Sequence, residues 1–215
     1  MHKNRNNMKK FWPVPKKGTK YVAVSLHNKN NSIPLSVIIR DILKLVKSVK
    51  ELKKILNEKL IKINGKIIKD IKYPVELFDI ININGKNYKT NFNGKKMFFE
   101  EIKKDDGSKV LKIIGKKNLG NNKIQFNLMD GRNIISDEKA NVNDSVVFDF
   151  NNKKIRKIVK MEKGNTAFVV SGKNSGMKGK IIEILNRDNK KLATVDAEKK
   201  ITVWIKNIIV MENEK

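Results

Sequence analysis

Three Asn-Gly pairs, at residues 64–65, 84–85 and 93–94, constrain the fold of this chain more than any other feature of its sequence. Asparagine and glycine both tolerate the left-handed backbone that a two-residue type I′ turn requires. The first pair separates the apolar segments 60–63 and 66–68, so it predicts a β-hairpin. The second pair follows a strand-like segment, and the third precedes the aromatic residues of another. We therefore expect much of the chain to fold as short antiparallel strands.

Short apolar segments separated by turn residues continue along the rest of the chain. Within residues 86–160 they predict an all-β domain. They are found at residues 109–114, 123–128, 145–150 and 153–159. Residues 161–211 contain further segments of this kind and fit a small barrel of about five strands.

Residues 32–58 are the part of the chain with the apolar spacing of helices. Pro34 suits the first turn of a helix, and apolar residues follow at helical spacing as far as Val46. The sequence Ser48-Val49-Lys50-Glu51 matches a capping box, so we expect a second helix to begin at Ser48. Its lysines lie off the apolar stripe. They predict a basic outer face, which either contacts a polyanion or simply faces water.

Charge restricts the partners of this protein. The 215 residues include 48 Lys and Arg against 22 Asp and Glu, a formal net charge of +26. Repulsion of this size destabilises a compact state unless a polyanion neutralises it. Nucleic acid is therefore the leading expected partner, and an anionic membrane surface is the second. Residues 1–31 contain basic residues and no acid, so we expect an N-terminal extension that is disordered alone and folds against nucleic acid.

Several classes of protein are excluded by residues that the chain lacks. The absence of cysteine excludes disulfides, zinc–thiolate sites and thiol catalysis. The N-terminal residues lack the apolar core of a secretory signal, and no segment is apolar over the length of a membrane span. His2 and His27, the two histidines, both lie in the N-terminal extension, so no Ser/His/Asp set can be assembled. We expect no catalytic residue, metal, cofactor or small-molecule substrate.

The glycine-rich segment VVSGKNSGMKGKIIEI, residues 169–184, raises the question of a phosphate-binding loop. A nucleotide-binding P-loop requires glycine where Asn174 stands and a hydroxyl residue where Ile181 stands, followed by a helix. The residues after Gly179 are β-branched and favour a strand instead. The loop is therefore predicted to be a β-turn that offers backbone N–H groups and lysines to an RNA backbone. Asn174 is expected to brace this turn.

Five segments occur in the order found in one family of ribosomal proteins. They are FWPVPKK, SIPLSVIIRDILKL, INGKIIKDIKYPVELFDIININ, KIQFNLMDGRNI and FVVSGKNSGMKGKIIEI. On these segments, which extend from about residue 11 to residue 210, the chain resembles the archaeal-type small-subunit ribosomal protein S4e family. The order of several segments makes this resemblance specific.

The resemblance implies a non-enzymatic, cytoplasmic protein of the small ribosomal subunit. Its partners would be small-subunit rRNA and neighbouring ribosomal proteins. The implied architecture is an α+β multidomain protein that ends in an SH3-like KOW barrel with Gly172, Asn174, Gly176 and Gly179 at its core motif. The expected domains are an N-terminal extension at 1–31, an S4-type (alpha-L) RNA-binding domain at 32–85, a central β domain at 86–160 and the KOW barrel at 161–215.

Two other functions share these sequence features and stay open at this point. An RNA-modifying enzyme with the same RNA-binding domain would need a large catalytic domain, for which the chain has no length left. A KOW-containing transcription or translation factor would bind only transiently.

The residues expected to contact rRNA are mostly lysines, which neutralise phosphate without reading sequence. Trp12 either stacks on an unpaired base or anchors the extension to a β domain, and we favour anchoring. Trp204 lies among apolar residues and is expected at the edge of a core. The full set of expected RNA-binding residues is Lys3, Arg5, Lys9, Lys10, Trp12, Lys16, Lys17, Arg40, Lys44, Lys47, Lys50, Lys53, Lys54, Lys62, Lys66, Arg132, Lys173, Asn174, Lys178 and Lys180.

Overall fold

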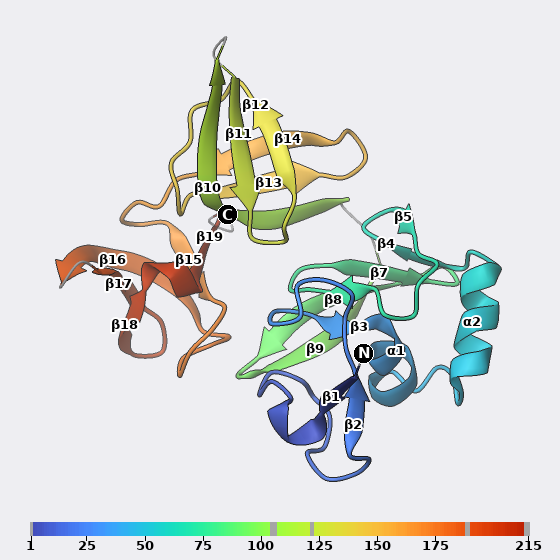
Figure 1. The fold of residues 1–215 in the computed structure, drawn as a ribbon. Coiled ribbons are helices and arrows are strands. Elements are labelled where there is room, and N and C mark those ends of the chain that lie inside the picture. Colours follow the sequence, from blue (N-terminus) through green and yellow to red (C-terminus); the bar gives the residue numbers. More distant parts are fainter. Residues whose placement is uncertain (1, 104–106, 121–122, 188–189, 213–215) are drawn as a thin grey trace. The chain divides into compact units, whose positions relative to one another are not determined.

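The chain is mostly β-structure and divides into two compact units, Met1–Gly107 and Ser108–Lys215. The structure is a computed structural model and describes residues 2–103, 107–120, 123–187 and 190–212 (Figure 1). Its strands form three five-stranded sheets and two two-stranded sheets across these residues. Within the same residues, no helix has the length and apolarity needed to cross a membrane.

The first unit is built on a five-stranded antiparallel sheet with the strand order β5-β4-β7-β8-β9. Asn64 and Gly65 both have positive φ, 48° and 75°, and join the first hairpin as a type I′ turn. Asn84 and Gly85 do the same between the next two strands, with φ of 48° and 84°. The hairpins predicted at the first two Asn-Gly pairs are therefore present. Strands β8 and β9 also form a hairpin near the third pair, but Asn93 pairs with Lys96 as the last residue of β8, so the turn consists of Gly94 and Lys95. The strands are β4 (Ile61–Ile63), β5 (Lys66–Ile67), β7 (Ile80–Ile83), β8 (Lys86–Asn93) and β9 (Lys96–Ile102).

Two short helical segments follow the N-terminal region, and both end where the backbone turns left-handed. The first comprises α1 (Leu35–Val37) and a π-helical turn, η2 (Ile38–Ile42). The sequence predicted Pro34 in the first turn of this helix. Pro34 is instead the N-cap residue, immediately before the first turn. Lys44 has a φ of 53°, which stops this helix before Val46, the end expected from the apolar spacing.

The second helix, α2 (Val49–Asn57), begins at the residue predicted for it. The side chain of Ser48 accepts a hydrogen bond from the backbone N–H of Glu51, as a capping box requires. At the other end Lys59 has a φ of 59°, and Leu60 N–H donates to Ile55 O at 3.3 Å. This closes the helix with a Schellman-type turn.

The N-terminal extension is ordered in this structure, whereas the sequence predicted disorder in the isolated chain. It forms a two-stranded sheet and a helical turn, and its aromatic residues anchor it to the five-stranded sheet. Met97 N–H in β9 donates to Phe11 O at 2.9 Å, and the Phe11 ring meets Phe92 edge-on at 6.3 Å. The elements of the extension are β1 (His2–Asn4), η1 (Arg5–Asn7) and β2 (Tyr21–Ala23), and β1 pairs with β2. A second two-stranded sheet is formed by β3 (Ile33–Pro34) and β6 (Pro74–Val75).

The second unit contains two five-stranded antiparallel sheets. The central sheet has the order β12-β11-β10-β13-β14, and the C-terminal sheet has the order β18-β17-β16-β15-β19. The central sheet consists of β10 (Ser108–Gly120), β11 (Lys123–Leu128), β12 (Asn133–Ser136), β13 (Ser145–Asp149) and β14 (Lys154–Val159). The C-terminal sheet consists of β15 (Thr166–Val169), β16 (Lys178–Arg187), β17 (Lys190–Asp196), β18 (Lys200–Trp204), the helical turn η3 (Ile205–Asn207) and β19 (Ile208–Met211).

Each sheet of the second unit has its own hydrophobic core. Leu111, Ile113 and Phe126 lie in the core of the central sheet, and Val169 and Val195 lie in that of the C-terminal sheet. Strand β19 pairs with β15 and also lies against β10 and β13. The two sheets are thus joined through the last strand of the chain.

The compact units do not follow the domain boundary expected between residues 85 and 86. Strands β7 and β8 pair on either side of that boundary and belong to one sheet. The chain divides instead between residues 107 and 108. The physical reason is that the Asn-Gly turn at 84–85 continues a sheet, since a tight hairpin keeps its two strands hydrogen-bonded.

Candidate nucleic-acid interface

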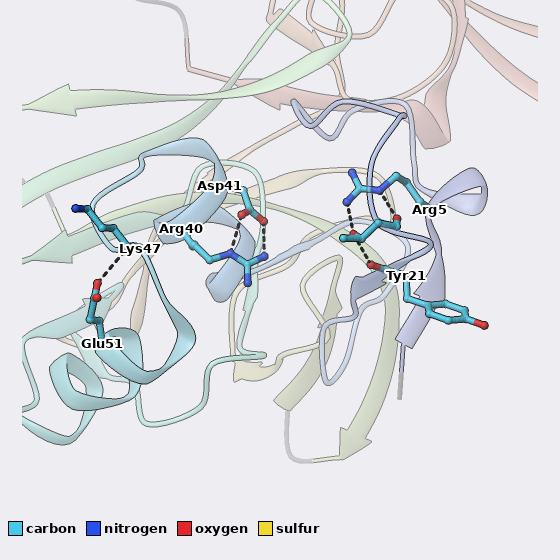
Figure 2. Close-up of polar contacts among 7 residues, drawn as sticks. Arg5, Tyr21, Arg40, Asp41, Lys47 and Glu51 are labelled. Atoms are coloured by element: carbon cyan, nitrogen blue, oxygen red, sulfur yellow. Dashed lines mark hydrogen bonds and ion pairs between the residues drawn. The ribbon is translucent and has the colours of Figure 1, made fainter.

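Helix α2 separates its apolar and basic residues onto opposite faces. Leu52 and Leu56 are buried, whereas Lys50, Lys53 and Lys54 are exposed. The carboxylate of Glu51 accepts a hydrogen bond from the backbone N–H of Lys47 at 2.8 Å, which leaves the Lys47 side chain directed away (Figure 2). Glu51 therefore serves the helix N-terminus, where a carboxylate is stabilising. The lysines keep a positive outer face.

The β4–β5 hairpin, which follows α2 in the sequence, contributes two more exposed lysines. Ile61 and Ile63 in β4 are buried, and Lys62 between them is exposed because side chains alternate along a strand. Lys66, which pairs with Ile63, is also exposed. The Asn64 side chain hydrogen-bonds at both ends of its amide group. Asn64 donates to Asp79 Oδ1 at 2.7 Å and accepts from Ile80 N–H at 2.9 Å.

Arg40 is held by an acid and is not a free cation. Its Nε and Nη2 donate to the two carboxylate oxygens of Asp41 at 2.7 and 2.8 Å (Figure 2). The side-chain hydrogen bond to Asp41 raises the pKa of Arg40. Asp41 offsets the positive charge of Arg40 locally. Lys44, which has a left-handed backbone conformation, is exposed.

Arg5 closes a loop of the N-terminal extension. Its Nε donates to Thr19 O at 2.7 Å and its Nη2 to Thr19 Oγ1 at 2.7 Å (Figure 2). Its Nη1 donates to Pro15 O at 2.8 Å. Thr19 Oγ1 donates in turn to Tyr21 O. Arg5 is thus used within the protein, while the side chains of Lys9, Lys10, Lys16 and Lys17 are exposed and that of Lys3 is partly buried.

The burial of Trp12 argues against a base-stacking role. Its side chain is only 6% exposed, and its indole N–H is buried without a hydrogen-bond partner. A base cannot reach a ring that the protein already covers. The ring instead anchors the extension, because burying an aromatic side chain of this size is strongly favourable. The structure supports the anchoring interpretation that the sequence favoured.

The glycine-rich loop between β15 and β16 uses several of its own N–H groups. Gly176 N–H donates to Val169 O at 2.8 Å, and Met177 N–H donates to Asn174 O at 3.3 Å. These two amides are therefore not offered to an RNA backbone, which corrects the expectation for this part of the loop. Asn174 contributes its backbone carbonyl to this turn. The side chains of Lys173, Lys178 and Lys180 are exposed.

Gly179 is required by a close backbone approach. A Cβ atom at this position would lie 2.1 Å from Asp196 O and 2.6 Å from its carbonyl carbon. Gly172 and Gly176 instead have positive φ, 105° and 88°, which only glycine adopts without strain. The three glycines of the motif therefore have structural reasons, independent of any phosphate.

Arg132 also has partners inside the protein. Its Nε lies 3.1 Å from Asp130 Oδ2, and its guanidinium lies over the ring of Phe150, 4.6 Å from the centroid. Of the expected contact residues, then, the arginines and Trp12 are held within the protein. The lysines other than Lys3 are exposed.

A pair of residues near the C-terminus was not among the expected contacts. Trp204, which the sequence predicts at the edge of a core, is 38% exposed, and Lys206 Nζ lies 4.8 Å from its ring centroid. The period of two in β18 contained the signal, because Ile201 and Val203 are buried and the residues between and after them face outward.

Comparison with known proteins identifies two families along this chain. The S4 domain matches residues 34–81, and the ribosomal family S4e matches residues 84–155. The first match contains α2 and the β4–β5 hairpin with their exposed lysines. The chain is accordingly an S4-domain protein.

Relatives match most of the chain. The small ribosomal subunit protein eS4 of Nanoarchaeum equitans is 34% identical over 185 residues, which cover 82% of this chain and 79% of the relative. That of Archaeoglobus fulgidus is 29% identical over 222 residues, with 100% of this chain and 94% of the relative covered. The crystal structure of the 30S ribosomal protein S4e from Thermoplasma acidophilum has a TM-score of 0.75 at 30% identity and covers 86% of this chain and 96% of that one.

This chain belongs to the ribosomal family S4e. The resemblance predicted from the five ordered segments is thereby confirmed. Membership of this family makes the chain a structural, non-enzymatic protein, as the sequence predicted.

Proposed function

We propose that this chain is a constituent of the small ribosomal subunit in the cytoplasm and holds folded rRNA through exposed lysines. The main contact would be made by α2 and the β4–β5 hairpin. One observation carries this proposal: within the matched S4 domain, the outer face of α2 presents Lys50, Lys53 and Lys54, while its inner face is buried.

The chemistry of this face suits a backbone contact. A lysine ammonium is a point charge on a flexible stem, so it neutralises phosphate and releases counterions without reading a base. Lys47, Lys62 and Lys66 extend the same charge around the helix N-terminus and the hairpin. The only acid in the first turn of α2 is Glu51, and its carboxylate is occupied by a backbone N–H. The exposed lysines around this helix outnumber that one carboxylate, so the local charge attracts phosphate.

The remaining basic segments would supply secondary contacts. We propose that the lysines of residues 1–31 and of the 172–180 loop reach rRNA, and that the C-terminal sheet is the KOW barrel implied by the resemblance. Supporting this, the C-terminal sheet has five strands and its glycine-rich loop presents exposed lysines. Neighbouring ribosomal proteins would be further partners. The arginines at 5, 40 and 132 would act inside the protein.

The proposal is tested by changing Lys50, Lys53 and Lys54 together to Gln in the full chain. If each lysine neutralises about one phosphate, the slope of log K against log salt should fall in magnitude by roughly 2 to 3. The fold should survive, since all three side chains are exposed. Binding is measured on small-subunit rRNA at several salt concentrations, with circular dichroism as the check on folding.

The matched control changes Lys139, Lys153 and Lys154 to Gln. These lysines are also exposed, lie outside the proposed contacts and remove the same charge. Their slope should stay close to that of the unchanged protein. Equal loss in both variants would mean that net charge alone drives binding, and the proposed face would be rejected.

Permanent assembly is distinguished from transient binding by sedimentation. A constituent of the small subunit should remain with the particle in high salt, because many backbone contacts are held at once. Release into the supernatant at moderate salt would favour a transient factor instead.

A further inference from the structure

The outer face of the C-terminal sheet carries an apolar row that crosses three strands. Leu185 in β16 pairs with Leu192 in β17, and Leu192 pairs with Trp204 in β18. Directly opposed residues of an antiparallel sheet point to the same face. Leu185 and Trp204 are 39% and 38% exposed, so this row faces outward. The inner face of the same strands is built from Ala193 and Val203, which are buried in the core.

Trp204 is the aromatic end of this row. It is the last residue of β18, an edge strand of its sheet, and it is followed by the helical turn η3. Lys206 in that turn places its ammonium 4.8 Å from the indole centroid. An exposed tryptophan with a cation at its ring offers a flat apolar surface and a positive charge at one point.

The rows around the apolar row are mainly basic. On one side Arg187 pairs with Lys190, and both are exposed. On the other side lies the row of Glu183, Thr194 and Thr202, followed by the row of Lys180, Asp196 and Lys200. Among the described residues of these rows and Lys206, there are five cations and two acids, Glu183 and Asp196. This excess of positive charge therefore favours an anionic partner over a protein surface that has few acidic residues.

We propose that Trp204 and Lys206 bind one unpaired nucleotide of RNA. The base would stack on the indole, and the ammonium would move to the phosphate of the same or the adjacent nucleotide. This inference rests on the proposed function and adds a base contact to a protein otherwise expected to contact phosphates. Stacking suits this site because any base has a π-face, while the flanking cations follow the strand backbone. Apolar protein side chains would satisfy the indole but not the surrounding cations.

Tryptophan fluorescence tests the site directly. The chain has two tryptophans, and Trp12→Phe leaves Trp204 as the one emitter. A short, unstructured polyadenylate should quench its emission and protect it from acrylamide. Inorganic polyphosphate, a polyanion without bases, should bind but should do neither. Should the Trp12→Phe variant fold poorly, the difference between the unchanged protein and Trp204→Phe gives the same signal.

Affinity supplies the second measurement, with anisotropy of labelled polyadenylate as the readout. Trp204→Leu should weaken binding about tenfold, Trp204→Phe should retain most of it, and Lys206→Gln should lower the salt slope by about 1. Ile135→Ala, at an exposed apolar residue of the central sheet, is the control and should bind as the unchanged protein does.

The inference and the proposed function fail in different ways. If rRNA binds with its usual affinity while Trp204 emission and acrylamide access stay unchanged, the nucleotide site is rejected and the proposed function stands. Equal quenching by polyphosphate and polyadenylate would also reject base stacking. Loss of the salt-dependent rRNA binding attributed to α2 would reject the proposed function itself.

Discussion

Lys112 Nζ donates a hydrogen bond to the backbone carbonyl oxygen of Ile208 at 2.8 Å, inside the second compact unit. The same ammonium donates to Ile205 O. Lys112 is only 2% exposed, so β10 is joined to η3 and β19 by a buried cation. Burial lowers the pKa of Lys112 to about 8. A neutral amine retains two N–H groups, so both carbonyls keep their partner when the proton is lost.

The stability of the second unit should therefore rise with pH above about 8. The folded pKa lies below the unfolded value of 10.5, so between these values the unfolded chain binds more protons. The penalty of the buried charge is complete below pH 8 and is relieved toward pH 10.5. Between pH 7 and pH 9 we expect a gain of about 1 kcal/mol in the free energy of unfolding.

Urea denaturation of the unchanged protein and of Lys112→Met at both pH values measures this gain. The methionine variant has no titrating group at this position, and the pH-dependent gain should be absent from it. An identical pH dependence in the two proteins would contradict a lowered pKa at Lys112.

Gly179→Ala should destabilise the C-terminal sheet. The new Cβ would lie 2.1 Å from a backbone oxygen of Asp196, so strands β16 and β17 must shift. A forced backbone shift of this kind costs about 1–3 kcal/mol or more. The control is Gly115→Ala, whose nearest neighbour, Asn127 Nδ2, is at 3.5 Å, an ordinary contact. Thermal denaturation should separate the two variants, and equal midpoints would show that the sheet accommodates the methyl group.

Ser48→Ala should destabilise α2 by about 1 kcal/mol. The hydroxyl accepts the backbone N–H of Glu51 at 3.2 Å, and alanine would leave that donor without its cap. Ser48→Thr keeps an oxygen in place and should lose much less. Hydrogen exchange at the Glu51 amide reports the cap locally. An unchanged exchange rate in the alanine variant would show that the cap contributes little.

Asp41→Asn should strengthen rRNA binding. It removes the carboxylate that holds the Arg40 guanidinium at 2.7 and 2.8 Å, so the arginine becomes available to phosphate. The salt slope should grow in magnitude by about 1. Stability should change by only about 0.5 kcal/mol, since the pair is partly exposed.

Glu100→Gln is the comparison for this variant, because it removes one exposed acid of the same unit without freeing an arginine. If both substitutions strengthen binding equally in salt titrations, the gain comes from net charge and not from Arg40.

Local features of the fold followed from the sequence, because they depend on a few neighbouring residues. The Asn-Gly turns, the capping box at Ser48 and the outward-facing Lys62 in β4 each arise from backbone preference or from the period of the element. The basic face of α2 was predictable for the same reason. Its apolar stripe determines which residues face inward, and the lysines take the other side.

Only the tertiary structure decided which cations are available to RNA and which are used inside the protein. Arg5 closes a loop with Thr19, fourteen residues away, and Lys112 reaches carbonyls more than ninety residues away. Trp12 is covered by its surroundings, whereas Trp204 is exposed. Such outcomes depend on which distant strands meet. A residue's charge and period determine its preference for a face, and the packing of remote segments determines what that face contacts.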